Sequence, residues 1–261
     1  MKFSMMTYTV MRQKTYTVEE CVKIASDLKM DGIDWVTTYN RDPKELKKLS
    51  DDAGLPVVAH TFFLRDKTEP TFIGTAERSL DAACVLGAPV VMIPPAPFPE
   101  ITDPAENRKR WCDVLAQIAP LAEARGLILT VENFPGAASA FVTAADFYEA
   151  KKQVPYLKLT YDDGNAATGE DPVESLKKCF KDVAHVHFKD WDFCDDSGAI
   201  KMRNGKFGTA ALIGEGDVPS AAVFKTLKEL DYKGYINIEY ESMKYKADEA
   251  IRRALEFLRN I

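Results

Sequence analysis

The sequence predicts a single α/β domain, residues 1–261, folded as a parallel (β/α)8 barrel. Eight short β-rich runs alternate with eight stretches of helical periodicity, which is typical of a parallel sheet with crossover helices. Eight such units permit closure into a barrel of about 250 residues. The competing fold, an open doubly wound sheet, more often carries a Gly-rich phosphate turn after its first strand. No such turn follows the first predicted strand.

The predicted strands are short, and each is bounded by Gly, Pro, Asp or Asn, which interrupt regular structure. In chain order they are residues 2–8, 32–39, 55–63, 89–95, 127–133, 157–163, 184–190 and 235–241. A helical stretch separates each strand from the next, as parallel neighbours require.

The predicted helices cover residues 18–29, 43–52, 76–87, 105–126, 144–153, 174–182, 221–230 and 247–260. Four of them follow a side chain that can accept a hydrogen bond from the first turn, which predicts N-caps at Thr17, Asp42, Thr75 and Thr143. Pro43 and Pro172 each follow an aspartate. That order suits the first helical position, where proline's missing donor costs nothing.

Composition excludes several classes of protein. A net charge of −6 and a pI near 5.3 argue against nucleic-acid binding, which usually needs a basic surface. The five cysteines are scattered and odd in number, so we expect no disulfide framework and a reducing compartment. The first residues lack the apolar run of a leader, and no stretch predicts a membrane span. We therefore expect a cytoplasmic protein without nucleic-acid or membrane partners.

Polar side chains concentrate at the ends of the last four strands, the face where a parallel barrel carries its function. Successive side chains of a strand point to opposite faces, and the apolar ones, such as Val131 and Phe188, belong against the helices. The intervening positions then face the barrel axis. This rule selects Glu132, Asp162, His187 and Glu239.

Three carboxylates and one imidazole at one point need a counter-ion, because like charges at close range cannot all ionise unaided. A divalent cation meets this need. An oxygen-rich set with one nitrogen suits Mn²⁺, Mg²⁺ or Co²⁺ and tolerates Zn²⁺. We therefore expect one divalent metal ion as cofactor.

Five motifs resemble the xylose isomerase-like TIM barrel superfamily, which includes sugar phosphate isomerases/epimerases, ketose 3-epimerases, hydroxypyruvate isomerases and inosose dehydratases. They are VEN at 131–133, YDDGNA at 161–166, HVHFKD at 185–190, GEGDV at 214–218 and GYINIEYE at 234–241. The resemblance implies the same four metal ligands, with His187 rather than His185 as the imidazole. It also implies a role in carbohydrate metabolism and a homodimer or homotetramer.

The expected function is a metal-dependent sugar isomerase or epimerase acting on a small sugar or polyol. Its mechanism would use a metal-chelated enediolate, with Glu132 and Glu239 as catalytic acid and base. One alternative is a metal-dependent dehydratase of inosose or 3-dehydroshikimate type, and a more remote one is a non-catalytic sugar-binding barrel. Three histidines in all disfavour a trinuclear zinc nuclease. The last two strands lack a Gly-rich turn for phosphate, which favours a neutral substrate.

Four further residues are expected to bind substrate: His60, Asn165, Lys189 and Glu215. His60 ends the third strand, Lys189 shares the inward parity of His187, and Glu215 lies in a loop near the mouth. Asn165 stands where many relatives carry a substrate-binding histidine, and the second strand ends in VTTYN, where many carry Glu. The segment 191–216 exceeds a usual βα loop, which predicts a lid or, alternatively, an oligomer contact.

Overall fold

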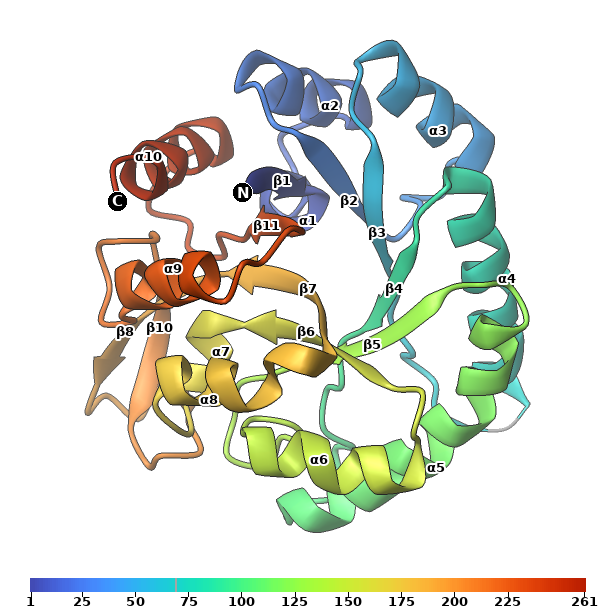
Figure 1. The fold of residues 1–261 in the computed structure, drawn as a ribbon, viewed down its shortest axis with the longest axis vertical. Coiled ribbons are helices and arrows are strands. Elements are labelled where there is room, and N and C mark those ends of the chain that lie inside the picture. Colours follow the sequence, from blue (N-terminus) through green and yellow to red (C-terminus); the bar gives the residue numbers. More distant parts are fainter. Residues whose placement is uncertain (69) are drawn as a thin grey trace.

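The computed structural model describes residues 1–68 and 70–261, and its strands form a closed parallel barrel (Figure 1). Around the barrel the order is β1-β11-β7-β6-β5-β4-β3-β2. The bounds are β1 (Lys2–Met6), β2 (Gly32–Val36), β3 (Val57–Thr61), β4 (Val90–Ile93), β5 (Ile128–Glu132), β6 (Lys158–Asp162), β7 (Val183–Phe188) and β11 (Tyr235–Ile238). The predicted α/β barrel is therefore confirmed.

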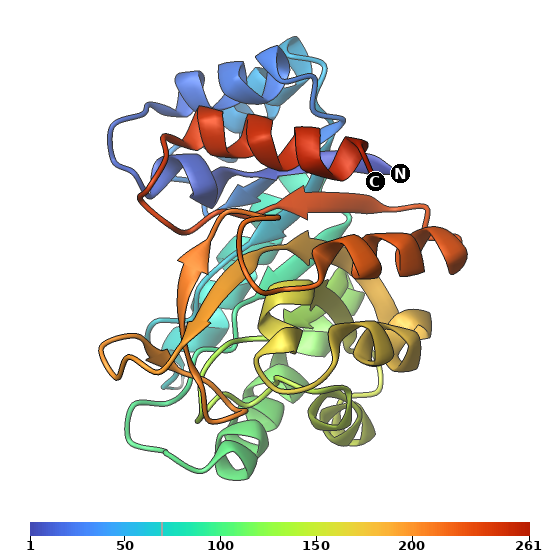
Figure 2. The same cartoon turned by 90° about the vertical axis from the view of Figure 1, so that its left-hand side faces the viewer.

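Helices surround the barrel, as Figures 1 and 2 show from two directions. They are α1 (Thr7–Met11), α2 (Val18–Asp27), α3 (Pro43–Asp52), α4 (Thr71–Leu86), α5 (Pro104–Glu123), α6 (Ala144–Gln153), α7 (Asp163–Ala167), α8 (Pro172–Cys179), α9 (Ser220–Glu229) and α10 (Ala247–Arg259). Among the described residues, no helix is both long and apolar enough to cross a membrane.

Three of the four predicted N-caps are confirmed. Thr17 and Thr143 each form a capping box with the acidic residue three positions on, and the Asp42 carboxylate accepts from the Lys44 amide. The prediction for Thr75 is wrong, because α4 begins at Thr71 and Thr75 donates its hydroxyl to the Thr71 carbonyl inside the helix. Phe72 is buried, so the first turn of α4 already packs against the core and extends the helix.

The two faces of the barrel strands differ in chemistry as the alternation predicts. Leu129, Val131 and Tyr161 belong to the large apolar core, whereas the intervening residues form a polar barrel interior. There the Thr130 and Thr160 hydroxyls lie 2.8 Å apart, and Ser4 donates to Asn237 at 2.9 Å. These contacts satisfy buried hydroxyl and amide groups that would otherwise cost free energy.

The long segment after β7 contains a three-stranded antiparallel sheet that the sequence prediction missed. Its order is β8-β10-β9, with β8 (Asp190–Cys194), β9 (Ile200–Lys201) and β10 (Phe207–Ala211). The Asp190 carboxylate fixes the base of the segment by accepting from the amides of Gly214, Gly216 and Val218. Trp191 is 1% exposed, so it serves packing within the chain rather than contact with another subunit. Whether the rest of the segment acts as a lid stays a prediction.

Candidate metal centre

The four residues selected by strand parity meet at the carboxyl ends of their strands. Glu132, Asp162, His187 and Glu239 each offer one ligand atom, and these atoms all lie within 4.8 Å of one another. His187 Nδ1 is 3.5 Å from Glu132 Oε2 and 3.5 Å from Glu239 Oε2. Glu239 lies just beyond β11, but its amide still donates to the Phe188 carbonyl, which holds it in line with the strand.

The unsatisfied atoms of this cluster show that it fits a cation. Asp162 Oδ2, His187 Nδ1 and Glu239 Oε2 are buried and have no hydrogen-bond partner among the described residues. Buried polar atoms almost always have a partner, and several carboxylate oxygens with one imidazole nitrogen are donors that divalent cations accept. The residues present therefore fit one divalent ion.

Lys189 supplies positive charge beside the cluster. Its ammonium lies 2.8 Å from Glu239 Oε1 and 2.9 Å from Glu241 Oε1, and its side chain is 6% exposed. Burial alone would raise the pKa of Glu239, but Lys189 and His187 outweigh it and hold that pKa below its usual range. Burial raises the pKa of Glu132, which has no such ion pair. The partners of the Lys189 ammonium are thus Glu239 and Glu241.

Beneath the cluster lies a carboxylate that sequence reasoning missed. Asp34 of β2 is fully buried, and its Oδ2 accepts from Asn237 Nδ2 at 2.9 Å and lies 3.6 Å from His187 Nε2. His187 therefore presents Nδ1 to the cluster and Nε2 to Asp34, an arrangement that orients an imidazole ligand. The available signal was parity, since Asp34 is the polar residue between Ile33 and Trp35.

His185 lies one layer deeper in the barrel than His187, beside Asp34. Its ring stands at 87° to that of His187, with centroids 5.1 Å apart, and its Nε2 is 3.9 Å from Asp34 Oδ2. Burial, with a smaller effect from His187, lowers the pKa of His185 to about 3. The ring is therefore neutral at pH 7 and outside the four-residue cluster.

Of the expected substrate contacts, His60 faces a cavity. Its Nδ1 donates to the Trp35 carbonyl at 2.8 Å, and the ring lines a cavity of about 740 Å³. Burial lowers the pKa of His60, so the ring is neutral. Because Nδ1 carries the proton, Nε2 is left as an acceptor.

Asn165 and Glu215 make other contacts. The Asn165 side-chain amide donates through Nδ2 to the Asn133 carbonyl at 2.8 Å and accepts through Oδ1 from Trp191 Nε1 at 3.3 Å. Both polar atoms of this side chain are therefore bonded within the protein. Glu215 lies on the surface, where it pairs with Lys244, which precedes α10, and with Arg253 of α10. The structure does not bring it to the buried cluster. A substrate role for either residue stays a prediction.

A family model described as xylose isomerase-like TIM barrel matches residues 22–261 of the chain. The chain belongs to this family. Inosose dehydratase of Clostridium perfringens is 26% identical, over 94% of this chain and 87% of that protein. The resemblance inferred from the five motifs is thus confirmed.

Solved structures of the same xylose isomerase-like fold superpose on the whole chain. One is the crystal structure of a protein described as IOLI with a bound zinc atom, with a TM-score of 0.81 and 18% identity over 100% of this chain and 97% of that one. Another is the 3-keto-D-glucoside 4-epimerase YcjR of E. coli, with a TM-score of 0.77 and 19% identity over 100% of both chains. At these identities the likeness establishes the shared fold.

Proposed function

We propose that this chain is a metal-dependent sugar or polyol isomerase or epimerase that removes and returns a proton at a carbon beside a carbonyl. The observation that carries the proposal is the pair of buried carboxylates, Glu132 and Glu239, which reach His187 Nδ1 at 3.5 Å each. They come from β5 and from the end of β11, strands on either side of β6 and β7. A planar carbon held between them has one carboxylate near each face.

Glu132, Asp162, His187 and Glu239 would hold the metal. A bound divalent cation polarises a carbonyl and so acidifies the neighbouring C–H. One of the two glutamates would remove the proton and the other would return one. Lys189 fixes Glu239 through Oε1, which leaves Oε2 turned toward the cluster. Return to the same carbon on its other face gives an epimer, and return to the adjacent carbon gives an isomer.

A dehydratase is the second candidate, favoured by the similarity to inosose dehydratase over 94% of the chain. Dehydration of a ketopolyol begins with the same proton removal and then loses a β-hydroxyl group as water. His60, which lines the cavity and has Nε2 as an acceptor, could contact that hydroxyl. The same carboxylate pair would thus serve either reaction.

The decisive experiment incubates the protein with ketoses, inososes and 3-dehydroshikimate in D2O, with Mn²⁺, Mg²⁺ or Co²⁺, and follows carbon-bound deuterium by NMR. Deuterium in an isomer or epimer supports the first proposal, and loss of water supports the dehydratase. Glu239→Gln should abolish the exchange, whereas Glu229→Gln on the exposed face of α9 should not. Absence of exchange across the panel, with no metal in the purified protein, would favour a non-catalytic sugar-binding barrel.

A further inference from the structure

The cavity lined by His60 lies over the half of the barrel mouth that does not carry the metal cluster. Its 740 Å³ are enclosed by residues that follow β1, β2 and β3 and by one face of α4. The cluster comes from β5, β6, β7 and β11, the neighbouring strands of the other half. Tyr8 lies between the two regions, since it lines the cavity and its ring is 5.5 Å from the guanidinium carbon of Arg12, which pairs with Glu241 at 3.9 Å.

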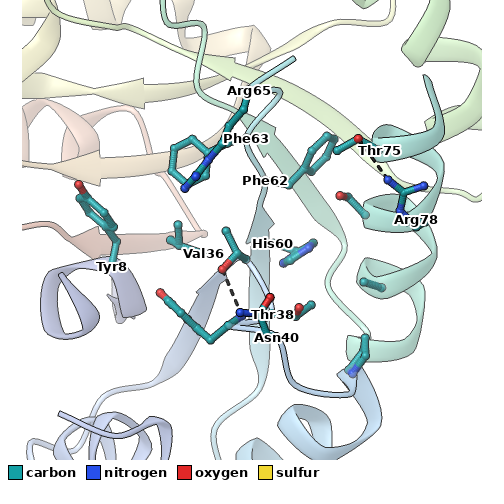
Figure 3. Close-up of a pocket in the computed structure, with 15 residues that line it drawn as sticks. Tyr8, Val36, Thr38, Asn40, His60, Phe62, Phe63, Arg65, Thr75 and Arg78 are labelled. Atoms are coloured by element: carbon teal, nitrogen blue, oxygen red, sulfur yellow. Dashed lines mark hydrogen bonds between the residues drawn. The ribbon is translucent and has the colours of Figure 1, made fainter. Parts of the chain in front are cut away.

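The charge of this cavity is opposite to that of the cluster. Among the described residues that line it, the charged side chains are Arg65 and Arg78, with no carboxylate. Arg78 extends from α4 and Arg65 from the loop after β3 (Figure 3). Arg78 donates to the Thr75 hydroxyl at 3.3 Å, and no described carboxylate lies within 4.0 Å of either guanidinium. In a chain with net charge −6, two arginines that have no acidic partner among the described residues favour an anionic ligand at this cavity.

The rest of the lining suits a polyol or a hydroxylated ring. Phe62, Phe63 and Tyr8 offer aromatic surface, and the His60 ring lines the same cavity. Its Nδ1 is bonded to the Trp35 carbonyl, which leaves Nε2 as an acceptor. This buried histidine is a second polar feature directed at a ligand. Its acceptor nitrogen suits a ligand hydroxyl, a donor that an ionised carboxylate does not provide.

The segment after β2 is strained where it forms the cavity wall. Thr37, Tyr39 and Asn40 have φ values of 63°, 49° and 60°, a left-handed conformation that is costly for side chains other than glycine. The Thr37 hydroxyl accepts from the Tyr39 amide at 3.2 Å and stabilises the turn. Strain of this kind concentrates at ligand sites, where the surrounding structure enforces it.

We propose that this cavity binds the part of the substrate that carries an oxyanion, a carboxylate or a phosphate, through the positive charge that Arg65 and Arg78 give to its lining. The position of the reacting carbon rests on the proposed function, but the oxyanion site rests on the cavity alone. The substrate is then an anionic polyol or sugar derivative. It extends from the metal cluster, at the ends of β5, β6, β7 and β11, to the arginines beside β3 and on α4. This differs from the neutral substrate that the sequence favoured, because the arginines lie in the loop after β3 and on α4 rather than at the last two strands.

The test measures equilibrium binding to the full-length chain by titration calorimetry in EDTA, so that no metal can hold the probe. The probes are inorganic phosphate, shikimate as a polyol carboxylate, and myo-inositol as a neutral polyol. Arg65→Gln and Arg78→Gln should each weaken binding of the preferred anion about ten-fold, equivalent to one charged hydrogen bond. Arg78→Lys should give an intermediate loss, since it keeps the charge without the planar fork. Tighter binding of phosphate or of shikimate tells which oxyanion the site prefers.

The matched control is Arg252→Gln, which removes the same charge from an exposed ion pair with Glu256 on α10 and should leave both affinities unchanged. Equal anion affinity in the wild type, Arg65→Gln and Arg78→Gln, or no anion binding at all, would overturn the proposal. Arginine-dependent anion binding without deuterium exchange would refute the proposed function alone. If deuterium exchange occurs and neither Arg65→Gln nor Arg78→Gln changes it, the oxyanion site alone is refuted.

Discussion

Replacing Lys189 with methionine should lower the free energy of unfolding of the metal-free protein by about 3–5 kcal/mol, the usual cost of breaking a buried ion pair. The Lys189 ammonium is 2.8 Å from Glu239 and 2.9 Å from Glu241. At an effective dielectric constant of about 20, a pair of unit charges at such a distance attracts by about 6 kcal/mol. Removing the desolvation cost of the ammonium returns part of this energy. Methionine keeps the apolar stem, so the remaining loss is mostly electrostatic.

A divalent cation at the four-residue cluster would replace much of the missing positive charge. The stability deficit of Lys189→Met should therefore shrink when the metal is added, because the variant gains more from binding than the wild type does. Urea unfolding followed by circular dichroism, with EDTA and then with saturating Mn²⁺, measures both values. The control Lys233→Met removes an exposed lysine paired only with Asp231 and should leave stability unchanged.

Two results would refute this reasoning. The first is a deficit below about 1 kcal/mol in EDTA, which would mean that Lys189 does not neutralise a buried charge. The second is a deficit of the same size with and without Mn²⁺, which would mean that no metal binds beside Glu239.

Three further changes test other parts of the structure. Asp34→Asn should weaken Mn²⁺ binding about 10- to 100-fold by calorimetry, because Asp34 orients His187 from 3.6 Å; unchanged affinity would count against this role. Lys158 and Lys151 outweigh burial and hold the pKa of Asp182 below its ordinary 3.8. The ionised Asp182 carboxylate should therefore add about 1 kcal/mol to the free energy of unfolding above pH 4. This contribution is lost as pH falls through the folded-state pKa, so the unfolding free energies of the wild type and Asp182→Asn should become equal in acid. Thr17→Ala removes a capping box and should cost about 1 kcal/mol in thermal or urea unfolding.

Much of the fold and the cluster could be predicted because strand alternation is a local property of the backbone. Val131 and Glu132 must point to opposite faces wherever the strand lies, so the sequence assigns one to the apolar core and the other to the barrel axis. Helix starts such as Thr17 and Asp42 are local in the same sense, because the cap bonds amides two or three residues away. The N-cap prediction at Thr75 was wrong because Phe72 packs against the core and extends the helix, which is a tertiary effect.

The sequence by itself determined that eight βα units close into a barrel and that Glu132, Asp162, His187 and Glu239 share its inner face. Only the tertiary structure decided which distant groups touch them. Asp34 lies beside His187 in the barrel interior, Lys189 pairs with Glu239 and Glu241, and Arg65 and Arg78 line one cavity. These neighbours depend on strand register, barrel closure and the packing of α4, which couple residues far apart in the chain and leave no local pattern in it.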